Sequence, residues 1–205
     1  MKVSNTTKKI ISNYTHENVG VRSNLMRILG QGKLGGTGRM IILPVDQGFE
    51  HGPDRSFAVN LKSHWMACKH AIPIMRQQGG GSIVNISSLA VLEGYPYLGY
   101  KTMKTAIIAM TQNLAMAHAD AAIRVNAILP GLMNTPMAIE ARVAAGTPRE
   151  QVIASRNARV PLGNRMGTAW DVAYAALFLH SDEAQFISGI WLPVDGAAWA
   201  SQGRY

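Results

Sequence analysis

The sequence has few of the features of secreted or membrane-spanning proteins. It contains one cysteine, Cys68, in 205 residues, which excludes an intramolecular disulfide and a cysteine-based metal site. No apolar run reaches the roughly 18 residues that a membrane-spanning helix needs. The first residues, MKVSNTTKKIISNY, lack the apolar stretch of a secretion signal. From these absences we expect a cytoplasmic protein with no membrane partner.

The net charge is positive but is not concentrated in one segment. It amounts to +8, with 8 Lys and Arg against 4 Asp and Glu in residues 1–58 and 12 against 8 in residues 59–205. Proteins that bind nucleic acid usually carry a basic run or stripe, often with aromatic residues among the basic ones. The sequence has no such run, so we expect no nucleic-acid partner. Apolar residues make up 47% and charged residues 16%, which is typical of a globular chain.

From residue 59 onward, helical patterns alternate with short, continuous apolar runs. The runs predict three parallel strands, at residues 82–86, 123–129 and 190–194. The helical patterns between them cover residues 60–78, 100–119 and 168–184. This alternation predicts an α/β fold with helices on both faces of a parallel sheet. RMIILPV, residues 39–45, is predicted to add a fourth strand at the edge of that sheet.

Two polar features precede residue 59, and neither has the spacing of a binding site. Residues 30–38, GQGKLGGTG, hold five glycines. A dinucleotide-binding loop follows a strand and opens a helix, whereas these glycines precede a strand, which favours a connecting loop. The second feature is an acidic and histidine cluster, which lacks regular ligand spacing and so favours a solvated loop over a metal site. It comprises Asp46, Glu50, His51 and Asp54.

Tyr100 and Lys104 are the most informative pair in the sequence. At i and i+4 they lie on the same face of the predicted helix. A tyrosine phenol has a pKa of about 10, and a nearby ammonium group lowers it, so the pair can act as a general acid and base. Ser88 stands twelve residues before Tyr100 and follows a predicted strand, as does Ser87. Since the carboxyl ends of parallel strands face the ligand crevice, a serine hydroxyl there can reach a carbonyl oxygen.

Residues 58–205 resemble the catalytic half of the short-chain dehydrogenase/reductases. The resemblance rests on five segments in the family's order: AVNLKS, GSIVNISS, YKTMK, IRVNAILPG and VDGA. It implies that Tyr100 donates a proton to a substrate carbonyl and that Ser88 stabilises the developing oxyanion, with Ser87 as the competing candidate. It also implies that Lys104 binds the nicotinamide ribose and tunes Tyr100, and that Asn60 supports a water molecule in the proton relay.

The same resemblance implies a cofactor, a substrate class and an assembly. Pro130, Gly131, Met133 and Thr135 would line the nicotinamide end of a site for NAD or NADP. The substrate would be a small ketone or alcohol. In this family the helix that bears the tyrosine and the helix before it contact partner subunits, so a homo-dimer or homo-tetramer is expected.

Residues 1–57 resemble the N-terminus of class I fructose-bisphosphate aldolases of the bacterial and archaeal type. Asp46 would then handle a proton at a strand end. Aldolase activity is not expected, because the Schiff-base lysine of a (β/α)₈ barrel would come from a late strand and the barrel takes about 250 residues. We therefore predict two parts, an aldolase-like fragment at 1–57 and a dehydrogenase-like catalytic half at 58–205.

The predicted fold is an incomplete Rossmann-like, doubly wound parallel sheet. Its cofactor-binding half, with a Gly-rich turn on a helix N-terminus, is replaced by a helix, a loop and a strand. We therefore expect weak or no oxidoreductase activity. The alternative is a non-catalytic chimera or oligomerising module, whose join arose either as a natural fusion or as an assembly junction.

Overall fold

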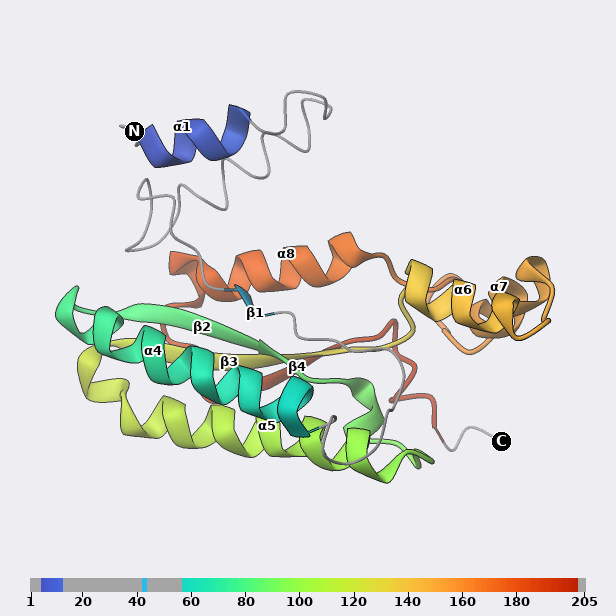
Figure 1. Cartoon of the computed structure of the whole chain (residues 1–205), viewed down its shortest axis with the longest axis horizontal. Helices are drawn as coiled ribbons and strands as arrows, with labels where there is room; N and C mark the ends of the chain where they lie inside the picture. Colours follow the sequence, from blue (N-terminus) through green and yellow to red (C-terminus); the bar gives the residue numbers. More distant parts are fainter. Residues whose placement is uncertain (1–4, 13–41, 44–56, 203–205) are drawn as a thin grey trace.

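The core of the fold is a parallel β-sheet. The computed structural model of the chain describes residues 5–12, 42–43 and 57–202. Within these residues, four strands pair in parallel in the order β1-β2-β3-β4 (Figure 1). The strands are β1 (Ile42–Leu43), β2 (Gly81–Ile86), β3 (Ile123–Pro130) and β4 (Trp191–Val194). The predicted α/β class and parallel sheet are confirmed, and two residues of the RMIILPV stretch form the expected edge strand.

Helices cover both faces of the sheet. On one face lie α4 (Ser63–Gln77) and α5 (Leu98–Ala117), and on the other lies α8 (Ala169–His180) (Figure 1). Because strand side chains alternate between faces, Ile83 packs toward α4 and α5, whereas Val84 packs toward α8. Both residues are fully buried. This two-sided burial explains why β2 and β3 read as continuous apolar runs.

The helix predicted over residues 60–78 consists of two parts. A π-helical segment, η1 (Phe57–Lys62), leads into α4. Cys68, Ile72 and Met75 of this helix are in the core, and Cys68 is only 2% exposed. Burial raises the pKa of the Cys68 thiol to about 11, so this cysteine is an inert core residue. Trp65, on the same helix, is 60% exposed and lines a surface groove between α4 and α5.

Two helices lie between β3 and α8, in a segment for which the sequence pattern predicted no helix. These are α6 (Pro136–Ala144) and α7 (Arg149–Asn157), which pack together beside the end of α8 (Figure 1). Proline at the first position of α6 is compatible with helix initiation, and the Thr135 hydroxyl accepts a hydrogen bond from the Ala138 amide. A small core of their own, centred on Ile139, Val152 and Met166, stabilises the pair.

Both ends of α8 are capped. The Thr168 amide and hydroxyl donate hydrogen bonds to the Asp171 carboxylate at 2.6 and 2.8 Å in a capping box, and these bonds lower the pKa of Asp171. At the other end, the Arg124 guanidinium of β3 donates to the carbonyls of Leu179 and Ser181 at 2.7 and 3.2 Å. A cation at this position also interacts favourably with the helix dipole.

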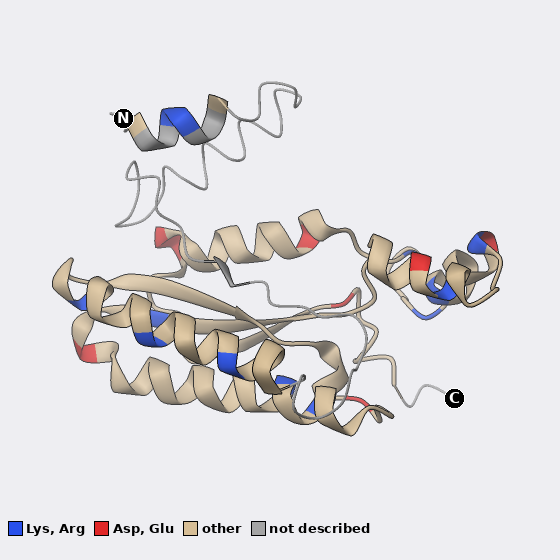
Figure 2. Cartoon of the chain, viewed as in Figure 1, with Lys and Arg blue, Asp and Glu red and all other residues tan. Residues whose placement is uncertain are grey.

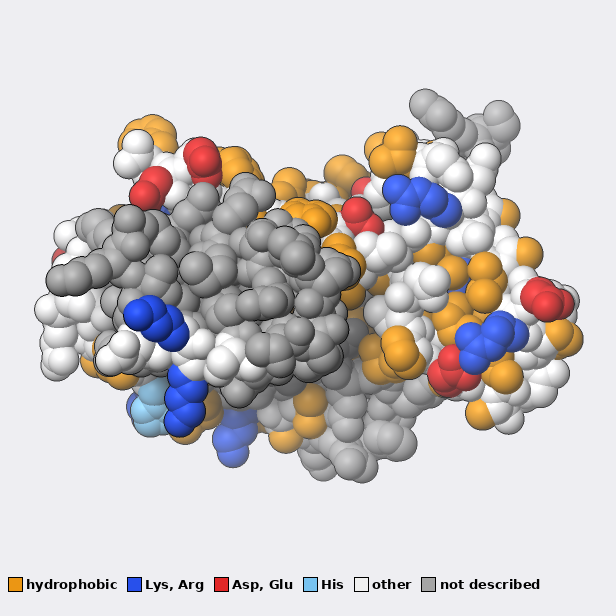
Figure 3. Space-filling model, turned by 90° about the horizontal axis from the view of Figure 1, so that it is seen from above, with side chains coloured by type: hydrophobic (Ala, Val, Ile, Leu, Met, Phe, Trp, Pro, Cys, Tyr) orange, Lys and Arg blue, Asp and Glu red, His pale blue; other side chains and the backbone are white. Residues whose placement is uncertain are grey.

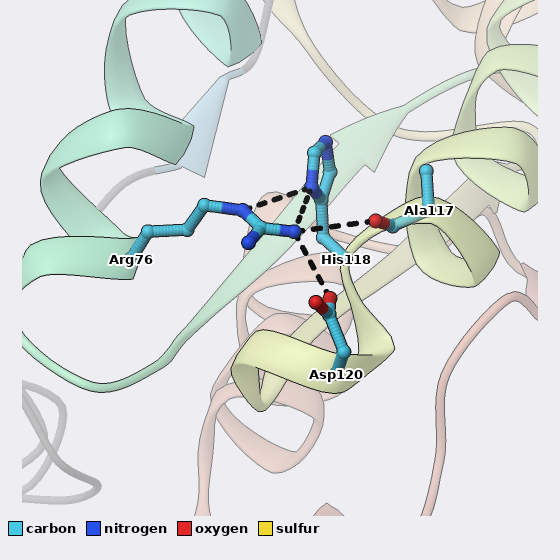
Figure 4. A network of polar contacts seen from close by, with 4 residues as sticks. All are labelled: Arg76, Ala117, His118 and Asp120. Atoms are coloured by element: carbon cyan, nitrogen blue, oxygen red, sulfur yellow. Dashed lines mark hydrogen bonds and ion pairs between the residues drawn. The ribbon is translucent and has the colours of Figure 1, made fainter.

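A polar network joins α4 to α5 where β2 and β3 begin (Figure 4). The Arg76 guanidinium donates to the Asp120 carboxylate at 2.9 Å and to His118 Nδ1 at 3.2 Å. It also donates to the Ala117 carbonyl at 3.4 Å. This network fixes the ends of the two helices that lie farthest from the carboxyl edge of the sheet.

The surface of the described residues shows scattered charge. Lysines and arginines occur on α4, α5 and the α6–α7 pair, whereas α8 carries neither (Figure 2). In the view from above, the described surface alternates between apolar, acidic and basic side chains (Figure 3). No helix among the described residues is long and apolar enough to cross a membrane, and these residues contain no cluster of three metal-ligating side chains. Asp46, Glu50, His51 and Asp54 lie outside the described residues.

Candidate active site

The carboxyl ends of three strands place the candidate residues at one edge of the sheet. Ser87 and Ser88 follow β2, the PGLMNT segment begins at the last residue of β3, and Asp195 follows β4. The β2–β3 register pairs Ile86 with Ile128, and the β3–β4 register pairs Pro130 with Val194. Segments separated by more than a hundred residues therefore meet at the edge where α/β folds bind ligands.

The two candidate serines have different contacts. Ser87 is 3% exposed, and its Oγ donates a 2.7 Å hydrogen bond to the Lys104 carbonyl, which ties β2 to α5. Ser88 is half-buried, and its Oγ accepts a hydrogen bond from the Ala90 amide at 3.2 Å, at the start of a short 3-10 helix. The Ser87 hydroxyl proton therefore has a structural acceptor, whereas the Ser88 hydroxyl acts as an acceptor in its own hydrogen bond among the described residues.

Lys104 is buried beside Tyr100. The Lys104 side chain is 0% exposed, and its Nζ donates to the Ile86 carbonyl at 3.2 Å. The same Nζ lies 5.6 Å from the centre of the Tyr100 ring. A positive charge held near a phenol favours the phenolate, and this effect grows in a low-dielectric interior. The i and i+4 positions on α5 thus bring the Lys104 ammonium group next to the half-buried Tyr100 phenol.

Asn60 lies in the π-helical segment and is buried. Its side chain is 2% exposed, and its Oδ1 has no hydrogen-bond partner among the described residues. Single turns of π-helix occur frequently at functional sites. A buried polar atom without a partner is the kind of group that a bound water molecule satisfies. The η1 segment also packs against α5, the helix that carries Tyr100 and Lys104.

The segment after β3 is held by backbone hydrogen bonds. The Gly131 amide donates to the Val194 carbonyl at 3.0 Å, which extends the pairing that begins at Pro130. Met133 forms a parallel bridge with Gly167, and its side chain packs where a Cβ on Gly167 would be. Thr135 then caps α6. The segment therefore has a fixed backbone from β3 to the first turn of α6.

Gly131 is required for close packing. A Cβ at this position would lie 2.7 Å from the Cβ and 2.9 Å from the Cα of Asp195. The space beside Gly131 is therefore taken by the backbone after β4. This glycine lets the two strand ends approach one another.

The chain matches a family model described as enoyl-(acyl carrier protein) reductase over residues 44–197. It belongs to the short-chain dehydrogenase/reductase family. The match covers most of the chain and includes every candidate residue named above. It also begins within the segment that the sequence assigned to an aldolase-like fragment.

Individual relatives agree with this family membership. An uncharacterized oxidoreductase of Thermotoga maritima is 36% identical over 157 residues, which cover 76% of this chain and 62% of that protein. The aldohexose dehydrogenase of Thermoplasma acidophilum has a TM-score of 0.69 at 33% identity, covering 77% of this chain and 63% of that one. ElxO, solved with NADP bound, has a TM-score of 0.64 at 32% identity, covering 73% and 58%. The chain thus spans about three fifths of the length of these relatives.

Tyr95 is a neighbour of the site that the sequence motifs do not include. The Tyr95 ring lies 5.5 Å from the rings of Tyr97 and Tyr100. All three come from the segment GYPYLGY, residues 94–100. The density of tyrosines in seven residues was the available signal. Tyr95 therefore joins the list of residues that border Tyr100.

Proposed function

We propose that the chain is an NAD(P)-dependent oxidoreductase that interconverts a ketone and an alcohol. Tyr100 would exchange the proton with the substrate oxygen, and Ser88 would donate a hydrogen bond to that oxygen. Lys104 would keep the Tyr100 phenol acidic enough for this exchange. The buried Lys104 side chain next to the Tyr100 ring carries the proposal, because an ammonium group at that position favours the phenolate form of Tyr100.

The residues at the carboxyl edge fit the nicotinamide end of a dinucleotide. NAD(P)H supplies a hydride when it is bound. We propose that the Lys104 ammonium group, which donates to the Ile86 carbonyl, also reaches a ribose hydroxyl of the bound cofactor. Pro130, Met133 and Thr135 lie on the ordered segment after β3, where a flat ring can rest. We propose that Asn60 Oδ1 orients a water molecule that passes the proton onward from Lys104.

We further propose that the 205-residue chain turns over slowly. No Gly-rich turn between a strand and a helix precedes Asn60 in the sequence, and such a turn binds the pyrophosphate in this family's cofactor site. Without those charge-assisted hydrogen bonds, cofactor affinity falls. Calorimetric titration with NADH and NADPH should therefore give weak binding, and micromolar affinity for either would contradict this part of the proposal.

The two serines provide a test of the proposed function. Ser88→Ala should lower NAD(P)-dependent turnover by about a hundredfold, because it removes a hydrogen-bond donor to the developing oxyanion. It also removes the acceptor of the Ala90 amide, which should lower the free energy of unfolding by about 0.5 to 1 kcal/mol. Ser87→Ala should lower the free energy of unfolding by about 1 kcal/mol through loss of its bond to the Lys104 carbonyl, without a comparable loss of turnover.

Steady-state rates and urea unfolding curves, measured on both variants, separate the two roles. Equal loss of turnover in the two variants at equal stability would contradict the assignment of Ser88 as the donor. A loss confined to Ser87→Ala would transfer the donor role to that residue.

A second candidate function is oligomerisation through α4 and α5. An open groove between these helices is lined by apolar residues, including Trp65, Ile72, Met110 and Leu114. Trp65 is 60% exposed at its rim, whereas Ile107 of the same helix pair is fully buried in the core. We propose a homo-dimer or homo-tetramer built on this groove. Sedimentation equilibrium should show a species heavier than 22.2 kDa, and a strict monomer at high concentration would exclude this assembly.

A further inference from the structure

The α6–α7 pair carries an excess of arginine close to the candidate active site. Residues 136–165 contain five arginines, two glutamates and no lysine. One arginine is neutralised, because Arg149 Nη2 donates to both carboxylate oxygens of Glu140 at 2.6 and 2.7 Å. Arg142, Arg156 and Arg159 have no carboxylate within ion-pair distance among the described residues. Figure 2 marks the arginine positions of this pair in blue on the ribbon.

Arg156 is anchored next to the segment that follows β3. Its Nε donates to the Met166 sulfur at 3.2 Å, and the Met166 amide donates to the Asn157 side chain at 2.9 Å. Met166 belongs to the core of the α6–α7 pair, against which Leu132 packs. The next residue, Gly167, forms the bridge with Met133. Arg156 is therefore held beside the segment proposed to line the nicotinamide end of the cofactor site.

Tyr95 lies beside α5, the helix that bears Tyr100 and Lys104. Its ring lies 5.5 Å from the Tyr100 ring, at an angle of 38°. Burial first, and then the charges of Arg142 and Arg159, lower the pKa of the Arg156 guanidinium, whereas the Tyr95 phenol raises it. Arg142, Arg159 and Tyr95 are thus the groups whose charges act on Arg156. The Tyr95 ring itself borders Tyr100.

The Arg156 guanidinium is half-buried, and a thioether is a weak acceptor for it. A guanidinium remains charged in proteins, and it is partly desolvated here without a carboxylate partner among the described residues. Two further guanidinium groups add to the local positive potential. An anion of planar or tetrahedral shape would satisfy the fork of donors that Arg156 presents.

We propose that Arg156, supported by Arg142 and Arg159, binds an anionic group of the substrate and so selects carbonyl and alcohol compounds that carry a carboxylate, sulfonate or phosphate. This inference rests on the proposed function for the reacting end of the substrate. Tyr100 would contact the reacting oxygen, Tyr95 would contact the body of the substrate, and Arg156 would contact its anionic end.

Ligand-observed NMR titrations test the anion site without requiring turnover. The probes are 4-(hydroxymethyl)benzoate, 4-(hydroxymethyl)benzenesulfonate and benzyl alcohol, which share the reacting alcohol and differ in charge. The proteins are the unmodified chain, Arg156→Gln and the control Arg149→Gln, which changes an arginine already paired with Glu140. NADH and NADPH form a further pair of probes, because the two cofactors differ by one phosphate.

The two anionic alcohols should bind the unmodified chain at least about tenfold more tightly than benzyl alcohol, as expected for a charge-assisted hydrogen bond. Arg156→Gln should remove that preference, and Arg149→Gln should retain it. Equal binding of charged and neutral alcohols, or equal effects of the two variants, would overturn the proposal. If Arg156→Gln weakens the binding of NADPH alone, the proposal is also overturned, because the anion bound by Arg156 would then be the cofactor phosphate.

Turnover assays separate this inference from the proposed function. If neutral and anionic alcohols are oxidised equally well, the oxidoreductase activity stands and the anion site is wrong. If the anionic alcohols bind through Arg156 but no NAD(P)-dependent oxidation occurs, the anion site stands and the proposed activity is wrong.

Discussion

Replacing Tyr100 with phenylalanine should lower NAD(P)-dependent turnover by a factor of about 10² to 10⁴, the range attributed to general acid–base catalysis. The substitution removes the one hydroxyl that lies on the same helix face as Lys104, one turn away. Phenylalanine keeps the ring that lies 5.6 Å from Lys104 Nζ and 5.5 Å from Tyr95. The packing around α5 should therefore survive while the proton donor is lost.

The measurement is single-turnover oxidation or reduction at millimolar cofactor, so that weak cofactor binding does not conceal the chemical step. Tyr174→Phe is the matched control, because Tyr174 is on α8, on the opposite face of the sheet from α5, and is 49% exposed. This control should keep the rate of the unmodified chain. If the unmodified chain is no faster than Tyr100→Phe, the proposed oxidoreductase function is wrong and the oligomerising function becomes the better one.

The strands of the core could be predicted from the sequence, because β2 and β3 are buried on both faces. Their residues are mostly apolar on both faces, and glycines or a left-handed residue mark where each begins. The strands end within one residue of their predicted bounds. The capping box of α8 was equally predictable, because Thr168 and Asp171 interact only with each other and the local backbone.

Features that depend on distant contacts could not be predicted. The choice between Ser87 and Ser88 required knowledge of which hydroxyl faces α5, and the sequence spacing left both open. The two helices of the α6–α7 pair bury only a small core, so their apolar pattern is weak. The hydrogen bond from Arg156 to Met166 and the bridge between Met133 and Gly167 place α7 beside the segment after β3, and no local pattern marks these contacts.

The candidate site consists of local pairs that tertiary contacts bring together. Tyr100 and Lys104 needed only a helix to share a face, and this is why the sequence could identify them. Asn60 is buried against α5 because it lies in the π-helical segment. The sequence does not predict that segment or the lack of a hydrogen-bond partner for Asn60 Oδ1 among the described residues. Sequence reasoning is thus strongest where function depends on one element and weakest where three elements meet.

Lowering the pH from 7 to 4 should destabilise the fold through His180. Burial, and then the charge of Arg124, lowers the pKa of this imidazole from 6.5 to about 4. Its Nε2 has no hydrogen-bond partner among the described residues, so no contact there offsets the cost of a charge. Below pH 6.5 the unfolded chain takes up a proton that the folded chain does not. The free energy of unfolding therefore falls between pH 6.5 and about pH 4, in total by about 3 kcal/mol.

Urea unfolding curves at pH 7.0 and pH 4.5 measure this loss, and two glutamine variants isolate its source. His180→Gln should flatten the pH dependence, since glutamine does not titrate, whereas His70→Gln, at an exposed position of α4, should retain it. Acidic groups that titrate in this range affect the unmodified chain and both variants alike, so they cancel in the difference. A pH dependence in His180→Gln equal to that of the unmodified chain would mean that the acid sensitivity arises elsewhere. The end of α8, where Arg124 binds the carbonyls of Leu179 and Ser181, would then tolerate a protonated His180.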